Sequence, residues 1–372
     1  MTTYLRQFDL TFTCVGPVFI GSGQKYSSKE YAVVEGKSRW AYFPDMEKLY
    51  ALVVSRGLAA SFEQFVLNTG GQGQRGTRLG DWLTRNGIKN TPGSHGGYAV
   101  EIGPLQKSKP QRGRDGSVPA MNDIHEFIKD GFGNPYVPGS SVKGLLRSLV
   151  LQHQLHRVVS GRPNPRPDER TEMARLRRAN RPGPKPDDAV NDLLQAIRVS
   201  DSPSLPLASL QIVQKVDRPL EGADSGMPLY REALKPATAF TVRVVVDTSV
   251  EQHGGWPDGA QFLTDIEQVA AGVNKARYAD YAAKYMGGDP FDGPYVYLGG
   301  GAGYRSKTIV TDQNQMAAIL DKQFNRGSRP VPHKAKTQQL DVSPLALKVA
   351  KTGDNEYEEM GLCEISVKEV TE

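Results

Sequence analysis

Alternating apolar and polar residues predict several short β-strands along the chain. From Phe8 to Cys14 every second residue is apolar, and the residues between them are Asp9, Thr11 and Thr13. This period-two pattern is typical of a strand with one buried face. Shorter patterns of the same kind predict strands over residues 31–34, 39–43, 97–103, 238–246, 295–298 and 360–367.

Helical spacing of apolar residues predicts helices between these strands. Asp45 is a suitable N-cap for a short helix that carries Leu49 and Val53. Apolar residues recur at helical spacing over 142–159 and over 261–285, so we predict an amphipathic helix in each range. Weaker signals predict a helical turn around Trp82, a helical segment over 124–128 and a helix that begins after Thr311.

Composition and length favour an α+β protein of two domains. The 372 residues include 39 Gly and 25 Pro, which suits short strands and long loops better than a helical bundle. Residues 160–186 hold six prolines among many arginines, so we interpret this range as a disordered basic insertion or linker. The predicted domains are residues 1–159 and residues 187–372.

Positive charge is concentrated in loops. The net charge is +5, yet residues 157–185 alone carry nine Lys and Arg against three acidic residues. Smaller basic clusters lie at 107–114 and 326–336. Basic clusters in Gly- and Pro-rich loops indicate a polyanionic partner, most simply nucleic acid. Solvated surface loops produce the same pattern, and charge alone does not separate the two interpretations.

Composition also excludes several classes of protein. No apolar run reaches the roughly 18 residues that a membrane span requires, and the first residues lack a signal-peptide core. Cys14 and Cys363 are too far apart in sequence for a metal knuckle or a disulfide framework. We therefore expect a soluble cytoplasmic protein that has neither a metal site nor a cofactor.

The strongest local motif is PYVPGSSVKGLLR, residues 135–147. An extended stretch turns at a Pro-Gly pair and enters a helix with Ser140 and Ser141 in its first turn. The free N–H groups and positive dipole end of a helix favour an anion such as phosphate. Lys143 and Arg147 are four residues apart and project from one helix face. An ordinary N-cap with two exposed cations accounts for the same residues equally well.

A second motif is the Gly-rich loop GGGAGYRSKT, residues 299–308. It lacks the Gly-Lys adjacency of a P-loop and the G-x-G-x-x-G spacing of a dinucleotide fingerprint. Gly301 and Gly303 allow close approach to a phosphodiester chain, and Tyr304 can stack on a base beside Arg305 and Lys307. A tight turn at a sheet edge is the structural alternative. A shorter version of this pattern comprises Gly21, Ser22, Gly23 and Lys25.

Catalytic motifs are scarce. The chain contains no H-E-x-x-H and no G-x-S-x-G motif, and its carboxylates are scattered. His153 and His156 lie three residues apart on a predicted helix, where they could be metal ligands or general bases. Such a pair more often occupies the polar face of a helix. The sequence therefore predicts neither catalytic nor metal-binding residues.

Three motifs together resemble the RAMP superfamily of CRISPR-associated proteins. They are GPVFIGSG at 16–23, PGSSVKGLLR at 138–147 and the Gly-rich loop. Their order and spacing, with Glu30-Tyr31 followed by YFPD at 42–45, more closely resemble the family of fifth subunits of type III-A Csm effector complexes. The resemblance covers nearly the whole chain except the loops at 68–97, 104–120 and 160–186.

The resemblance implies a fold of two ferredoxin-like (RRM-like) RAMP domains with long basic loop insertions. It also implies a non-catalytic crRNA-binding subunit that caps the filament at the crRNA 3′ end and supports crRNA 3′-end maturation in antiviral defence. The implied partners are crRNA, single-stranded target RNA, neighbouring Csm backbone and small subunits, and host ribonucleases. In the related backbone subunit, target RNA is cut with an aspartate in the loop shortly after the IGGS-like segment. Here the loop 24–30 contains no aspartate and ends in Glu30.

These arguments predict one set of RNA-binding residues and leave two alternatives. The predicted residues are Gly21, Ser22, Gly23, Lys25, Ser140, Ser141, Lys143, Arg147, Gly301, Gly303, Tyr304, Arg305 and Lys307. One alternative is a RAMP endoribonuclease that cleaves crRNA precursor or target RNA, with His125, His153 or His156 as general base. The other is a nucleotide-binding protein that uses the glycines of the Gly-rich loop.

Overall fold

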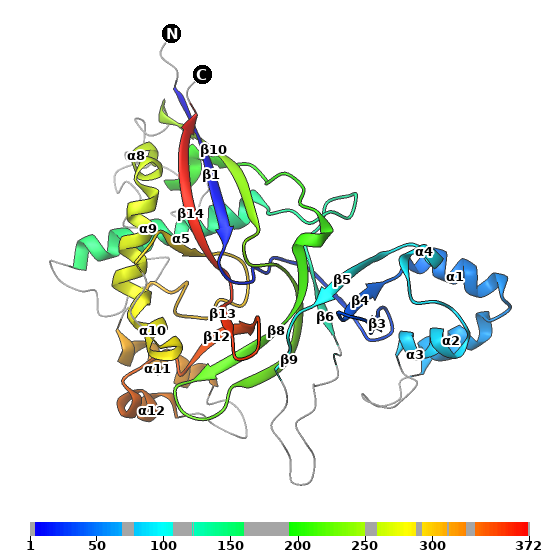
Figure 1. The fold of residues 1–372 in the computed structure, drawn as a ribbon. Helices are drawn as coiled ribbons and strands as arrows, with labels where there is room; N and C mark the ends of the chain where they lie inside the picture. The colour runs from blue at the N-terminus through cyan, green and yellow to red at the C-terminus, as the bar shows by residue number, and fades with distance from the viewer. Residues whose placement is uncertain are drawn as a thin grey trace.

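The computed structural model describes residues 4–68, 78–106, 121, 123–159, 193–249, 259–287, 292–310, 312–324 and 332–370. Two β-sheets form the centre of the molecule (Figure 1). A group of helices covers the smaller sheet, and a small helical lobe stands at the far end of the larger sheet. The predicted α+β class is therefore confirmed.

The smaller sheet is antiparallel and joins distant parts of the chain. Its strand order is β11 (Tyr295–Tyr297), β14 (Leu362–Val370), β1 (Leu5–Cys14), β10 (Ala239–Asp247) and β7 (Ile197–Val199). Phe12 of β1 lies between Phe240 and Ile365 on the two neighbouring strands. The strand predicted from the alternation over 8–14 is confirmed, since its apolar residues are all buried.

Two helical segments pack against this sheet. They are α5 (Gly139–Val159) and a run composed of α8 (Gly259–Thr264), α9 (Ile266–Asn274), the π-helical η4 (Lys275–Ala279) and α10 (Asp280–Met286). Buried residues such as Leu146 and Ile266 share one core with the apolar face of β1. The helices predicted over 142–159 and 261–285 are therefore confirmed, although a π-helical turn interrupts the second.

The larger sheet contains both parallel and antiparallel pairs. Its order is β2 (Gly21–Tyr26), β6 (Ile124–Phe127), β9 (Ser225–Leu234), β8 (Leu210–Pro219), β5 (Tyr98–Ile102), β4 (Trp40–Phe43) and β3 (Ala32–Val34). β6 is parallel to β9, and β5 is parallel to β8. A further hairpin of β12 (Ala346–Lys351) and β13 (Tyr357–Glu359) extends the end of β8. The shorter helices α11 (Gln313–Phe324), α12 (His333–Leu340), η2 (Leu193–Ala196) and η3 (Leu207–Ser209) lie in the second half of the chain.

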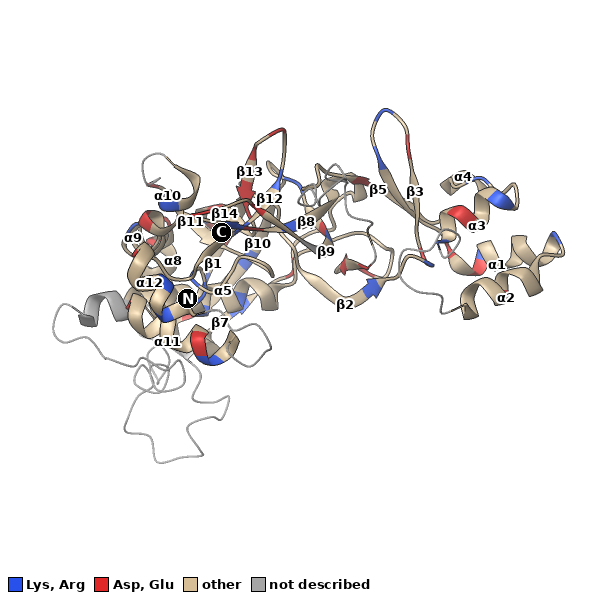
Figure 2. Cartoon of the chain, turned by 90° about the horizontal axis from the view of Figure 1, so that it is seen from below, with Lys and Arg blue, Asp and Glu red and all other residues tan. Residues whose placement is uncertain are grey.

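A helical lobe is inserted between β4 and β5. It comprises α1 (Met46–Ser55), α2 (Ala59–Leu67), α3 (Leu79–Arg85) and α4 (Pro92–His95). The predicted N-cap is confirmed, because the Asp45 carboxylate accepts hydrogen bonds from the N–H groups of Glu47 and Lys48. The lobe has its own core, which includes Leu49, Phe62 and Trp82. Figure 2 shows this lobe at one end of the molecule and α8–α12 at the other.

One charged network lies buried beneath the larger sheet. Lys129 donates to Oε2 of the fully buried Glu232 over 2.5 Å and to the Tyr98 hydroxyl over 3.0 Å. The Phe127 N–H and the Tyr98 hydroxyl also donate to Glu232. Burial raises the pKa of Glu232, and the Lys129 ammonium opposes that shift. The two charges therefore satisfy each other inside the protein.

A second buried carboxyl, Glu359 at the end of β13, lies among tyrosines. The hydroxyls of Tyr278 and Tyr297 donate to its Oε2 over 2.6 and 3.2 Å. Burial raises the pKa of Glu359 to about 7, although the two hydroxyls oppose the shift. The charge of this carboxylate thus depends on pH near neutrality.

The structure corrects one prediction and adds several elements. Residues 124–128 were predicted to be helical, which is wrong, because Ile124–Phe127 forms β6 between β2 and β9. Thr311, the predicted start of a helix, lies outside the described residues, and the Asp312 carboxylate accepts the Gln315 N–H at the start of α11. The patterns did not predict α2, α12, β2, β8, β9, β12 and β13.

Both sheets combine strands from the two sides of residues 160–186. That segment and the basic cluster at 107–114 lie outside the described residues, so their roles as insertions or loops stay predictions. The division into domains 1–159 and 187–372 likewise stays a prediction. Within the described ranges, no helix is both long and apolar enough to cross a membrane.

We predict that Lys129→Met destabilises the fold by roughly 3–5 kcal/mol, because it leaves the Glu232 carboxylate buried without a cation. The double variant Lys129→Met/Glu232→Gln should recover most of this loss, since a neutral amide can still accept from the Phe127 N–H. Urea unfolding of the wild type, both single variants and the double variant measures the four free energies. Equal losses in Lys129→Met and the double variant would contradict this account.

The buried Glu359 predicts a pH dependence of stability. Its carboxyl holds a proton up to about pH 7 in the folded protein, but only to about pH 4.5 when unfolded. The folded state therefore binds the extra proton, and stability falls by roughly 3 kcal/mol as pH rises from 4.5 to 7. We expect the unfolding free energy of Glu359→Gln, measured in urea from pH 5 to pH 8, to decline less than that of the wild type over the same range. A decline equal to that of the wild type would show that Glu359 does not cause it.

Candidate RNA-binding site

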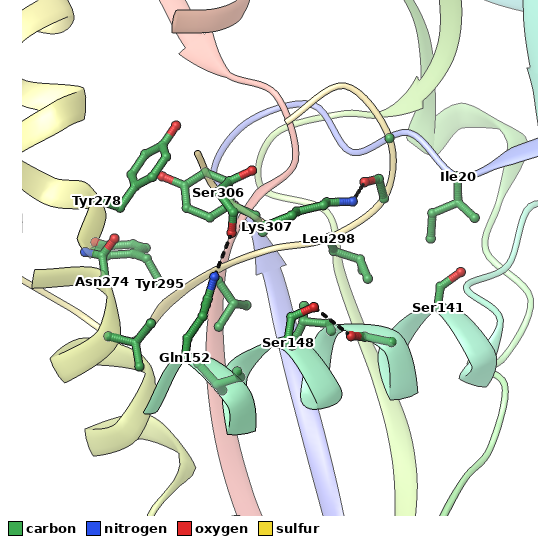
Figure 3. A pocket seen from close by; sticks show the side chains of 18 of the residues that line it. Ile20, Ser141, Ser148, Gln152, Asn274, Tyr278, Tyr295, Leu298, Ser306 and Lys307 are labelled. Carbon is green, nitrogen blue, oxygen red and sulfur yellow. Dashed lines mark hydrogen bonds between the residues drawn. The ribbon is translucent and has the colours of Figure 1, made fainter. Parts of the chain in front are cut away.

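The three sequence motifs meet around one cavity of about 440 Å³. The first motif contributes Gly21, the helix α5 contributes Ser140 and Ser141, and the Gly-rich loop contributes Arg305 and Lys307. Figure 3 shows Ile20 and Ser141 at one end of this cavity and Tyr278, Tyr295 and Asn274 at the other. Five of the thirteen predicted RNA-binding residues thus line a common space.

The wall formed by α5 is lined with polar side chains. Besides the two serines of its first turn, α5 presents Ser148 and Gln152 to the cavity. The Gln152 amide donates to the Thr308 carbonyl over 3.1 Å, and thereby ties α5 to the end of the Gly-rich loop. The Ser148 hydroxyl donates to the carbonyl of Gly144 one turn earlier.

Backbone N–H groups at the start of α5 already donate hydrogen bonds to other groups of the chain. The Gly139 N–H donates to the Asp201 carboxylate over 2.7 Å, and the N–H groups of Ser141 and Val142 donate to the Pro138 carbonyl. A carboxylate therefore already interacts with the positive end of this helix dipole. The serine hydroxyls, rather than these helix amides, are the groups that α5 offers to a ligand.

Glycines shape the loop that forms another wall. Gly299 and Gly301 have φ values of +77° and +97°, in the left-handed region that favours glycine. A Cβ at Gly299 would collide with the Phe19 carbonyl oxygen, which accepts a hydrogen bond from the Gly300 N–H over 2.7 Å. The close approach that Gly299 allows is thus an approach to the segment before Gly21.

Two cations belong to this loop. The Lys307 ammonium donates to the carbonyl of Gly299, and the Arg305 guanidinium lies 5.7 Å from the centre of the Tyr281 ring. Burial lowers the pKa of both side chains below their ordinary values. An anion that enters the cavity would stabilise their charged forms.

Aromatic residues and an amide complete the lining. Tyr278, Tyr295 and Tyr297 line the cavity together with Asn274. No sequence motif indicated that these residues or Gln152 bind a ligand. Their only sequence signal is the run of tyrosines near the end of the predicted helix over 261–285, and that pattern is equally typical of a core.

The other predicted residues lie outside the cavity lining. Lys143 donates to the Ile197 carbonyl over 2.8 Å, and Lys25 pairs with Asp123 at 2.7 Å. The Ser22 hydroxyl donates to Glu126, and Tyr304 packs against the cluster of Val310, Met316 and Leu320. Gly23, Arg147, Gly301 and Gly303 do not line the cavity either. An RNA contact at these eight positions stays a prediction.

The candidate catalytic residues are dispersed. His125 lies on β6, and His153 lies on α5 but does not line the cavity. The side chain of His156 is outside the described part of the structure. The Glu30 carboxylate accepts hydrogen bonds from the N–H and hydroxyl of Ser27, both at 2.8 Å. Among the described residues, no three His, Cys, Asp or Glu side chains are grouped so that they could hold a metal ion.

Comparison with known proteins identifies the family. The RAMP superfamily model matches residues 11–253. The CRISPR system Cms protein Csm5 of Mycobacterium tuberculosis is 49% identical to this chain over 99% of both chains. The protein of the same name from Streptococcus thermophilus is 30% identical over 98% of both.

Solved structures share the fold at lower sequence identity. One of them is a cryo-EM structure of a Csm–crRNA–target RNA ternary complex of a type III-A CRISPR-Cas system. A chain of that structure aligns with this chain with a TM-score of 0.64 and 17% identity. The alignment covers 96% of this chain and 100% of that one. The crystal structure of T. onnurineus Csm5 aligns with a TM-score of 0.53 and 18% identity, over 95% of this chain and 99% of that chain. The three motifs, the shared fold and the full-length sequence matches place this chain in the RAMP superfamily and, within it, in the Csm5 family.

Proposed function

We propose that this chain is the Csm5 subunit of a type III-A CRISPR Csm complex and binds crRNA without cutting it. One observation carries the proposal: three motifs that are far apart in sequence converge on one cavity. Full-length similarity to proteins named Csm5 supports the assignment to this complex.

The chemistry of the cavity suits a single-stranded RNA. Ser140 and Ser141 offer hydroxyls to phosphate and ribose oxygens, Ser148 Oγ can accept from a ribose 2′-hydroxyl, and Arg305 and Lys307 offer positive charge. Tyrosines at the other end offer aromatic faces to a base. Contacts to phosphate and ribose carry no sequence information, which suits a subunit that must accept many different guide sequences.

Several finer roles belong to the same proposal. The subunit caps the filament at the crRNA 3′ end, supports crRNA 3′-end maturation with host ribonucleases, and acts in antiviral defence in the cytoplasm. Its partners are crRNA, single-stranded target RNA and the neighbouring Csm backbone and small subunits. The two sheets would then correspond to ferredoxin-like RAMP domains. A solved structure with the same fold is part of a Csm–crRNA–target RNA complex, which supports these roles.

We predict that Lys307→Met weakens binding of a labelled single-stranded crRNA by about tenfold at low salt, which is equivalent to ~1.4 kcal/mol. The variant removes a cation from the cavity and, among the described residues, breaks a single side-chain hydrogen bond, the one to the Gly299 carbonyl. Fluorescence anisotropy across a KCl series measures the affinity. Lys48→Met is the matched control, because Lys48 lies on the distant helical lobe, where it pairs with Asp45. Equal affinities of wild type and Lys307→Met would contradict a role of the cavity in RNA binding.

We also predict that the purified protein leaves crRNA, repeat RNA and target RNA intact, with or without Mg²⁺. His125 lies on β6 and His153 on α5, and neither they nor Glu30 line the cavity, so these residues do not form an acid–base pair around one phosphodiester. Denaturing gel electrophoresis of end-labelled RNA tests this expectation. Defined cleavage that is lost on His125→Ala or His153→Ala would establish the endoribonuclease alternative instead.

A further inference from the structure

A row of basic side chains crosses one edge of the larger sheet. The strand register pairs Lys25 of β2 with His125 of β6, and His125 with Arg231 of β9. Residues paired in register on neighbouring strands project from the same face of a sheet. The row therefore runs from the exposed edge strand inward to Arg231.

Phe19 and the Gly-rich loop surround the inner end of this row. The Arg231 guanidinium lies 5.0 Å from the centre of the Phe19 ring, and the His125 ring meets the same ring edge-on at 6.4 Å. Gly301 passes so close that a Cβ there would lie 2.5 Å from Nη1 of Arg231. The missing side chain of Gly301 thus leaves room for the guanidinium.

Arg231 lacks a counter-ion within the described part of the chain. There its side chain makes neither a hydrogen bond nor an ion pair, although its Nε and Nη1 atoms are fully covered. The other basic residues nearby are compensated, because Lys25 pairs with Asp123, and Lys215 and Lys348 share Asp217. Burial lowers the pKa of Arg231, yet an arginine remains charged at neutral pH.

A partly buried cation without a counter-ion is unfavourable, and an anion that reaches it removes much of that penalty. Because Nε and Nη1 are covered, Nη2 is the guanidinium nitrogen that can donate a charge-assisted hydrogen bond to a phosphate oxygen. We propose that Arg231 binds a phosphodiester group of RNA, at a site that Lys25 and His125 approach from the edge of the sheet. This proposal rests on the RNA-binding function proposed above and adds a contact outside the cavity.

The Gly-rich loop connects this contact with the cavity. Gly299 and Gly300 line the cavity, while Gly301, the next residue, lies against Arg231. Lys307, which holds the Gly299 carbonyl, belongs to the cavity side of the same loop. The two cationic sites therefore lie on two sides of one short loop, where neighbouring phosphates of one strand can occupy both.

Arg231→Met tests the site, because methionine removes the charge and keeps an apolar side chain against Phe19. Binding of a labelled single-stranded RNA oligonucleotide to the full chain is measured by anisotropy from low to high KCl. Each phosphate contact with a single strand contributes about 0.7 to the slope of log affinity against log salt concentration. We expect Arg231→Met to reduce the slope by about this amount and Arg231→Lys to retain most of it.

The melting temperature of the RNA-free protein separates a binding role from a structural one. Because Arg231→Met breaks no ion pair with any residue that the structure describes, its melting temperature should equal or exceed that of the wild type. The matched control is Arg243→Met on the smaller sheet, where Arg243 pairs with Asp9 at 2.7 Å. This control should leave the salt slope unchanged.

Four results would overturn the proposal. An unchanged slope in Arg231→Met, while Lys307→Met weakens binding, would exclude the Arg231 contact and leave the RNA-binding function standing. A melting temperature several degrees lower in RNA-free Arg231→Met would assign Arg231 a structural role. Binding of inorganic phosphate by the RNA-free wild type but not by Arg231→Met, with equal RNA affinities and salt slopes in the two proteins, would assign the site to free phosphate. Absence of RNA binding by the wild type would contradict the proposed function and, with it, this site.

Discussion

The pairing of β1 with β10 and β14 is the constraint on which the rest of the structure depends. It brings the segment that follows β1 beside the segment that follows β11, and the two meet where the Gly300 N–H donates to the Phe19 carbonyl. The same sheet supports α5 through a shared core. Gly21, Ser141 and Lys307 lie more than a hundred residues apart in sequence, and they reach one cavity through this pairing.

Local patterns predicted the elements that bury only one of their faces. β1 and α5 each bury a single face, so apolar spacing identified them. β8 and β9 carry polar residues such as Gln214 and Glu232 in buried positions, and that composition hides the strand period. In residues 124–128, the spacing of Ile124, Phe127 and Ile128 also fits a helix. These residues form a strand because they pair with β2 and β9.

The candidate site was predictable in its motifs but not in its geometry. Sequence alone indicated Ser141, Arg305 and Lys307, because their neighbours form recognisable motifs. It could not show that Lys143 turns toward β7, since that contact depends on a strand more than fifty residues later. Nor could it distinguish the adjacent residues Arg231 and Glu232, which project from opposite faces of β9. Glu232 pairs with Lys129, whereas Arg231 has no hydrogen-bond partner among the residues that the structure describes.

The helical lobe leaves the larger sheet and returns to it at a single point. Phe43, at the end of β4, pairs with Tyr98, at the start of β5, and the whole lobe lies between them. Its core is separate from that of the sheets. The chain thus enters and leaves the lobe at one hairpin position, and α3 of the lobe also packs against β3. We therefore expect a change in the length of the lobe to leave the cavity, which is built from other elements, in its present shape.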